Sequence, residues 1–185
     1  MPRSSALPPL GTRAPEFSLP STDGPTVRLS GDLDAPAVLV AFLANHCPYV
    51  RHVERGFAQL AGEYQERGVI IFGICPNDSG AYPDDALPRL AEQKERAGFT
   101  FPYLVDETQE VTRAYAAACT PDFFLFDGDL ALAYRGQMDD SRPRTNRPVT
   151  GADLRAALDA VVAGRPLPAD QPPSVGCSIK WRPGR

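Results

Sequence analysis

One cysteine stands where a thiol could be reactive. Cys47 follows the apolar run 37–43, and from Pro48 onward apolar residues recur at helical spacing until Gly68. A thiol at a helix N-terminus faces unsatisfied backbone N–H groups and the positive end of the helix dipole, which lower its pKa from ~8.5 toward ~3.5–7.5. We therefore expect Cys47 to be a nucleophile. The alternative is a buried, inert thiol.

The residues around Cys47 do not decide whether another group helps its thiol to react. His46 could help by charge or by a hydrogen bond, but adjacent side chains in a turn often point apart, so a structural role is equally open. A metal site is not expected, because one cysteine and a neighbouring histidine do not supply enough ligands. No cofactor is expected either, since no flavin, nicotinamide or phosphate-binding glycine motif is present and electrons have to arrive through thiols.

Composition limits the classes of function. The 185 residues are 43% apolar and carry a net charge of -4 without blocks of like charge, which argues against binding to nucleic acid or to an anionic membrane. No apolar run approaches the ~20 residues that span a bilayer. The four cysteines are far apart, unlike a secreted disulfide framework. We therefore predict a soluble cytoplasmic protein.

Helical and strand-like segments alternate along the chain, which predicts an α/β fold. Residues 1–10 are expected to be a flexible N-terminus, residues 11–164 one domain, and residues 165–185 a Pro-rich tail that packs on the domain without a regular element. Within the domain the patterns predict strands at 37–43, 69–75, 122–127 and 131–137, and helices from Pro48 to Gly68, at 84–97, at 107–117 and, capped by Thr150, at 151–164.

Several motifs resemble the thioredoxin fold, and within it the peroxiredoxin-like branch of the alkyl hydroperoxide reductase and thiol-specific antioxidant group. "FLANHCPYV" is similar to the nucleophile turn of thioredoxins, and "GTRAPEFSLPSTDGPTVRLS" to the entry hairpin of that group. The resemblance implies a central mixed sheet flanked by helices, with an N-terminal β-hairpin. It places Cys47 on the nucleophile and, through "CTPDFFLFD", Pro121 on the cis-proline that faces it.

The sequence also departs from these families. Peroxiredoxins carry a Thr or Ser hydroxyl that positions peroxide, whereas the matching positions here are Val40 and Ala44. Thioredoxins carry a second cysteine three residues after the first, where this chain has Val50. A local disulfide is therefore excluded, and the resolving thiol has to come from elsewhere in the chain or from outside.

Two distant cysteines are candidates to resolve Cys47. Cys119 and Thr120 lie in the presumed cis-proline loop, so the resemblance favours a bridge from Cys47 to Cys119. Cys177 lies in the tail and is the second candidate, whereas Cys75 ends an apolar run and is expected to pack in the core.

A segment after strand 131–137 should also lie near Cys47, because that strand runs antiparallel to strand 122–127. Arg135 or Arg142 could there stabilise a thiolate or a peroxide oxygen. The alternative is that Asp139, Asp140 and Arg142 only fix a turn.

These features predict a thiol-dependent oxidoreductase of cell redox homeostasis. Its substrates would be protein or small-molecule disulfides, or peroxides reduced slowly, and an external thiol would reduce it, with a homodimer left open. The alternative function is a non-catalytic module that binds an extended peptide at the cis-proline loop.

Overall fold

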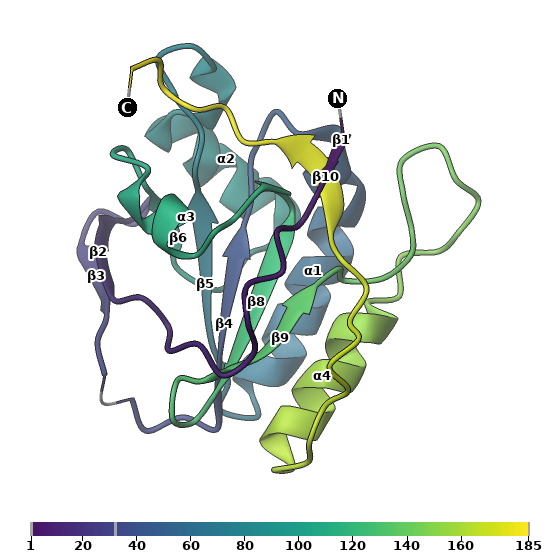
Figure 1. Cartoon of the computed structure of the whole chain (residues 1–185). Helices are drawn as coiled ribbons and strands as arrows, with labels where there is room; N and C mark the ends of the chain where they lie inside the picture. Colours follow the sequence, from purple (N-terminus) through teal and green to yellow (C-terminus); the bar gives the residue numbers. More distant parts are fainter. Residues whose placement is uncertain (1, 32, 185) are drawn as a thin grey trace.

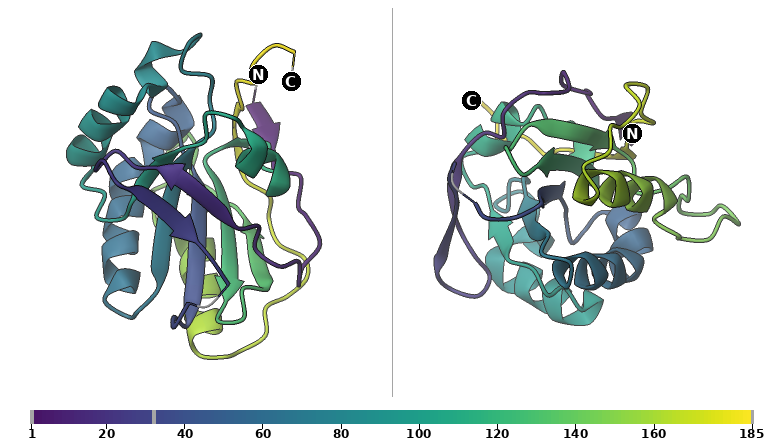
Figure 2. Two further views of the ribbon diagram at one scale, coloured as in Figure 1. Left: turned by 90° about the vertical axis from the view of Figure 1, so that its left-hand side faces the viewer. Right: turned by 90° about the horizontal axis from the view of Figure 1, so that it is seen from below.

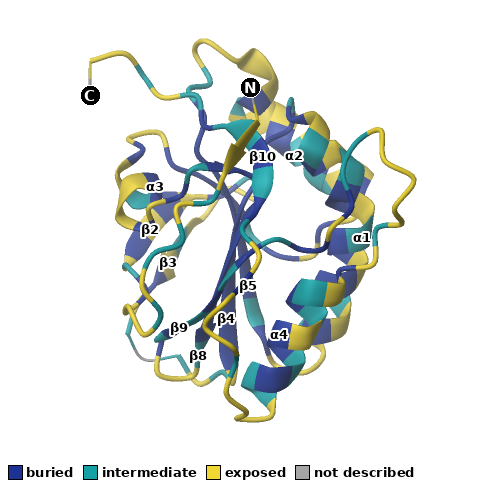
Figure 3. Ribbon diagram, turned by 45° about the vertical axis from the view of Figure 1, so that its right-hand side comes forward, coloured by how far each residue is buried: buried dark blue, intermediate teal, exposed yellow. Residues whose placement is uncertain are grey.

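A five-stranded mixed sheet forms the centre of the computed structural model, which describes residues 2–31 and 33–184 (Figure 1). The strands lie in the order β6-β5-β4-β8-β9. Strands β4, β5 and β6 are parallel, β8 is antiparallel to β4, and β9 is antiparallel to β8. Their bounds are Ala37–Phe42 (β4), Ile70–Cys75 (β5), Tyr103–Val105 (β6), Asp122–Asp127 (β8) and Leu132–Gly136 (β9). Every residue of β4 is buried, as its continuous apolar sequence predicts for a strand covered on both faces (Figure 3).

Two apolar layers cover the sheet. On one face, side chains such as Phe57 and Leu158 join the sheet to α1 (Pro48–Gln65), α2 (Leu87–Ala97) and α4 (Ala152–Val162). On the other face, Phe17 and Tyr115 pack with sheet residues. A hairpin and the short α3, Glu110–Ala114, lie over this face (Figure 2). The hairpin consists of antiparallel β2 (Phe17–Pro20) and β3 (Thr26–Leu29), which confirms the predicted N-terminal extension.

The helices differ from the predicted ranges mainly at their ends. A 3-10 turn at Pro83–Asp85 precedes α2, which therefore begins later than predicted. The predicted helix 107–117 is shorter because Gln109 and Ala116 adopt left-handed backbone angles that a helix interior does not accommodate. Thr150 is not the N-cap of α4; that position belongs to Gly151. No helix in the described part of the chain is long and apolar enough to cross a bilayer.

Strands form near both ends of the described chain, whereas the sequence predicted no regular element in the tail. β1 (Pro2–Ser4), β10 (Val175–Ser178) and β7 (Cys119–Thr120) make a second, antiparallel sheet in the order β1-β10-β7. Figure 1 shows β10 and β1 side by side above the central sheet. Because these strands are short and pair over long sequence distances, local periodicity does not reveal them.

Candidate functional site

Cys47 is the N-cap residue of α1. Its backbone is extended (φ -76°, ψ 118°), and its carbonyl accepts the amide of Arg51 at 3.0 Å as the first bond of the helix. Pro48 follows at the start of the helix, where a missing N–H removes no bond. The side chain is 0% exposed, so the positive end of the helix dipole acts on a sulfur shielded from water.

The sulfur of Cys47 contacts the sulfur of Cys177. The two Sγ atoms are 2.8 Å apart with both thiols unbonded, and Cys47 Sγ lies 3.2 Å from the carbonyl oxygen of Thr120. The hydrogen bond from Cys177 is the largest cause that lowers the pKa of Cys47 to about 6, against the opposing effect of burial. The same contact raises the pKa of Cys177. Within the pair the negative charge is therefore favoured on Cys47 and the proton on Cys177.

Strand pairing places Cys177 at this position. β10 lies antiparallel to β7 with Cys177 opposite Thr120 and Ser178 opposite Cys119. The thiol of Cys119 instead points to the carbonyl oxygen of Pro121, at 3.6 Å, and burial raises its pKa. The expectation that Cys119 is the thiol next to Cys47 is therefore wrong, because the thiol in contact with Cys47 is that of Cys177. Cys177 was only the second candidate because the tail has no periodic pattern that predicts where it lies.

His46 is held away from a direct role on the thiol. Its Nδ1 lies 2.5 Å from Oδ2 of the buried Asp85, and its ring stacks on Tyr82 with centroids 4.9 Å apart. These contacts support a structural role for His46 in the turn before Cys47.

Asp85 organises the turn that leads into Cys47, and nothing in the sequence marked it. One carboxylate oxygen accepts the amides of Asn45 (2.8 Å) and His46 (3.1 Å), and the other accepts Asn77 Nδ2 at 2.8 Å. Burial raises the pKa of Asp85, but the bonds from His46 and Asn77 outweigh burial and leave that pKa below its ordinary value. The ionised carboxylate thus fixes two successive amides immediately before the nucleophile.

The peptide bond between Thr120 and Pro121 is cis, as the motif predicted. The Thr120 side chain is 1% exposed, and its hydroxyl lowers the pKa of Cys47. The geometry gives this buried hydroxyl no hydrogen-bond partner among the described residues. Cys47 is therefore flanked by Thr120 on one strand and by Cys177 on the strand beside it.

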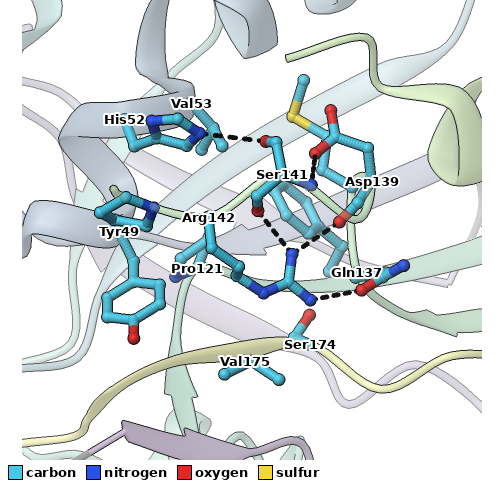
Figure 4. A pocket seen from close by; sticks show the side chains of 13 residues that line it. Tyr49, His52, Val53, Pro121, Gln137, Asp139, Ser141, Arg142, Ser174 and Val175 are labelled. Atoms are coloured by element: carbon cyan, nitrogen blue, oxygen red, sulfur yellow. Dashed lines mark hydrogen bonds between the residues drawn. The ribbon is translucent and has the colours of Figure 1, made fainter. Parts of the chain in front are cut away.

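Arg142 lies in a pocket beside the cis-proline, lined also by Tyr49, His52 and Val175 (Figure 4). Its guanidinium donates to the carbonyl oxygens of Asp139 (2.8 Å) and Ser141 (2.6 Å) and to the side chain of Gln137. These bonds make Arg142 a fixed part of the turn, which is the alternative that the sequence left open.

Two further expectations concern residues away from the thiol pair. Arg135 donates to the carbonyl of Pro8 at 2.7 Å and to Gln171 at 2.8 Å, so its charge is held by the terminal segments and not by Cys47. Cys75 is fully buried and burial raises its pKa well above the ordinary value, which confirms its packing role. No group of three or more metal-ligating side chains gathers within residues 2–31 and 33–184.

Comparison with known proteins shows the family of this chain. A family model described as "AhpC/TSA family" matches residues 10–135. This chain belongs to the AhpC/TSA family. Its solved relatives include an uncharacterized conserved protein from Geobacillus kaustophilus, which is 50% identical, with a TM-score of 0.95 over 100% of this chain and 98% of that one.

Two curated relatives of this chain carry names that describe thiol chemistry. The thiol-disulfide oxidoreductase ResA of Halalkalibacterium halodurans is 27% identical over 134 residues, which are 70% of this chain and 70% of that protein. A Mycobacterium tuberculosis protein whose name describes it as a candidate peroxiredoxin is 29% identical over 117 residues, 63% of this chain and 69% of its own.

The departures from the AhpC/TSA pattern lie inside the core. Val40 and Ala44 are both 0% exposed and belong to apolar layers, so neither position offers a hydroxyl to a peroxide. Val50 is likewise buried in α1. In this AhpC/TSA chain the thiol that contacts Cys47 comes from β10.

Proposed function

We propose that this protein is a thiol-dependent oxidoreductase that alternates between a Cys47–Cys177 dithiol and a Cys47–Cys177 disulfide. The observation that carries the proposal is the contact between the two sulfurs, 2.8 Å apart. With the pKa of Cys47 at about 6, the attacking group is largely thiolate at neutral pH, and thiolate is the reactive form.

With a disulfide substrate, the Cys47 thiolate attacks one substrate sulfur and expels the other as a thiolate, forming a mixed disulfide. Cys177 gives up its proton and attacks the sulfur of Cys47, which releases the second substrate thiol and leaves the Cys47–Cys177 bond. Two electrons pass from the protein to the substrate. An external thiol reductant, needed in two equivalents, restores the dithiol.

With a peroxide, the Cys47 thiolate attacks the O–O bond and expels an alcohol or water. Cys47 becomes a sulfenic acid, and Cys177 condenses with it to release water and form the same disulfide. Since Val40 and Ala44 provide no peroxide-positioning hydroxyl, we expect this reaction to be slow relative to that of peroxiredoxins that carry one.

The non-catalytic binding module is the weaker hypothesis, because it needs a free edge at the cis-proline loop. β7 ends at that loop, and β10 already pairs with it. A paired edge has fewer free backbone groups to offer to a peptide.

The test is oxidation of the full chain by one equivalent of oxidant, followed by peptide mapping of disulfides. We expect one intramolecular bond, between Cys47 and Cys177, and its loss in Cys47→Ser. Recovery of a Cys47–Cys119 bond, or of sulfenic or sulfinic acid on Cys47 with Cys177 still free, would contradict this cycle.

A further inference from the structure

β10 pairs with the strand that leads into the cis peptide bond. It lies along β7, with Cys177 opposite Thr120, directly before the cis peptide bond to Pro121. Main-chain pairing at a strand edge is a general way to bind an extended peptide. Here the chain's own residues make that pairing, and they bring their own sulfur to the nucleophile.

The fit of β10 on β7 depends on Gly176. A Cβ atom added to Gly176 would overlap the carbonyl oxygen of Thr120 and crowd the nitrogen of Pro121. These neighbours are backbone atoms, which cannot rotate away as a flexible side chain can. Any larger residue at position 176 therefore forces β10 away from β7.

β10 is also held along its other edge and beyond its end. β1 pairs with it through Pro2 opposite Cys177 and Ser4 opposite Val175. After the strand, Gln109 donates to the carbonyl of Lys180 at 2.9 Å and accepts the amide of Arg182 at 2.9 Å. The strand is thus fixed on both sides of Cys177.

The two sulfurs differ in access. Cys47 is 0% exposed beneath this arrangement, whereas Cys177 is partly exposed. Thiol–disulfide exchange needs an approach along the S–S axis, so a bulky partner needs space behind the sulfur it attacks. Cys47 does not offer that space while β10 is in place.

We propose that β10 is a built-in pseudo-substrate strand that restricts direct reaction of Cys47 to small oxidants and makes Cys177 the sulfur that exchanges with larger thiols. This proposal rests on the proposed thiol cycle and narrows the oxidants that react directly with Cys47 to peroxides and to disulfides smaller than glutathione disulfide. In the reductive half, a bulky thiolate attacks Cys177, the Cys47–Cys177 bond breaks, and Cys47 leaves as a thiolate. A second bulky thiolate then attacks the partner sulfur of this mixed disulfide, which releases a disulfide of the two bulky thiols and leaves Cys177 as a thiolate that takes up a proton.

The polarity of the disulfide supports this order. A thiol of lower pKa leaves faster in exchange. Once Cys177 carries the bulky group it no longer donates to Cys47, but the Thr120 side chain and the backbone at Val50 still lower the pKa of Cys47, so attack at Cys177 expels a stabilised thiolate.

The test uses Cys177→Ser, in which a hydroxyl of similar size keeps β10 in place and leaves Cys47 alone at the site. Reaction of Cys47 with hydrogen peroxide and with glutathione disulfide is followed by mass spectrometry. We expect modification by peroxide and little by glutathione disulfide. Adding Gly176→Ala should raise the rate with glutathione disulfide by about tenfold or more, and the rate with peroxide far less.

A matched glycine provides the control. Gly62 lies in α1, and a Cβ there would meet nothing within 4 Å, so Gly62→Ala in the Cys177→Ser background should leave both rates unchanged. Gln109→Asn shortens the side chain that holds Lys180 and Arg182 while keeping a residue that tolerates the left-handed backbone at that position. It should raise the glutathione rate in the same direction without touching β7.

The outcomes separate this proposal from the thiol cycle. If Cys47 in Cys177→Ser reacts with glutathione disulfide as fast as an exposed thiol, β10 is no barrier and the proposal fails while the cycle stands. The proposal also fails if hydrogen exchange shows β10 released in Gly176→Ala and the ratio of the two rates does not change. If Cys47 reacts with neither reagent even after β10 is released, the nucleophile itself is wrong and the proposed cycle fails.

Discussion

The thiol of Cys177 should control the ionisation of Cys47, and replacing it measures that control. The pKa of Cys47 falls from an ordinary 9.0 to about 6, which corresponds to about 4 kcal/mol in favour of the thiolate. The largest cause is the hydrogen bond from Cys177. Since a hydrogen bond to a charged group contributes about 1.5–3 kcal/mol, Cys177→Ala should raise the pKa of Cys47 to between about 7 and 8.

Cys177→Ser is the matched control, because its hydroxyl keeps a donor at nearly the same place. It should leave the pKa of Cys47 closer to 6 than the alanine variant does. The assay is the ultraviolet absorbance of the thiolate against pH, with Cys47→Ser as the blank for the remaining cysteines. An unchanged midpoint in Cys177→Ala, or identical midpoints in the alanine and serine variants, would refute the assignment of the low pKa to this contact.

The same pKa predicts how stability depends on pH in the reduced protein. The pKa of Cys47 is lower in the folded chain than the ordinary 9.0, so the unfolded chain binds the proton more tightly. The stabilisation is complete above about pH 9 and is lost as pH falls to about 6. When the free energy of unfolding from chemical denaturation is plotted against pH across this window, the slope should be smaller for Cys177→Ala than for the parent protein.

Three further predictions concern residues around the pair. Burial raises the pKa of Asp122 from 3.8 to about 7. The neutral carboxyl group therefore stabilises the fold below pH 3.8, and this stabilisation is lost as the pH rises to about 7. Urea denaturation should show that Asp122→Asn stabilises the protein by up to about 4 kcal/mol at pH 8 and by far less at pH 4. Equal effects at both pH values would contradict that. Cys119→Ser should leave formation of the Cys47–Cys177 disulfide intact on peptide maps, and loss of that bond would restore Cys119 as the resolving thiol. Asp85→Ala should cost about 2–3 kcal/mol and slow Cys47, since two amides before it lose their acceptor; unchanged reaction rates in the folded variant would show that Asp85 is not a positioning residue.

The sequence alone indicated Cys47 as the candidate nucleophile and predicted the scaffold that presents it. The apolar run before Cys47 and the helical period after Pro48 are local patterns: the first indicates a strand buried on both faces, and the second a helix buried on one face. The hairpin of β8 and β9 was predicted for the same reason, because its two strands are adjacent in sequence. Pro121 as the cis-proline came from the resemblance of its motif.

Only the tertiary structure decided which sulfur meets Cys47. The pairing of β10 with β7 joins residues more than fifty positions apart in a strand of four residues, too short to show a period. Asp85 was equally hidden, since its role depends on amides that reach it across the fold. The identity of a thiol nucleophile follows from local chain geometry, whereas its partner, its charge state and its access are set by segments that meet only when the two ends of the chain pair over the cis-proline loop.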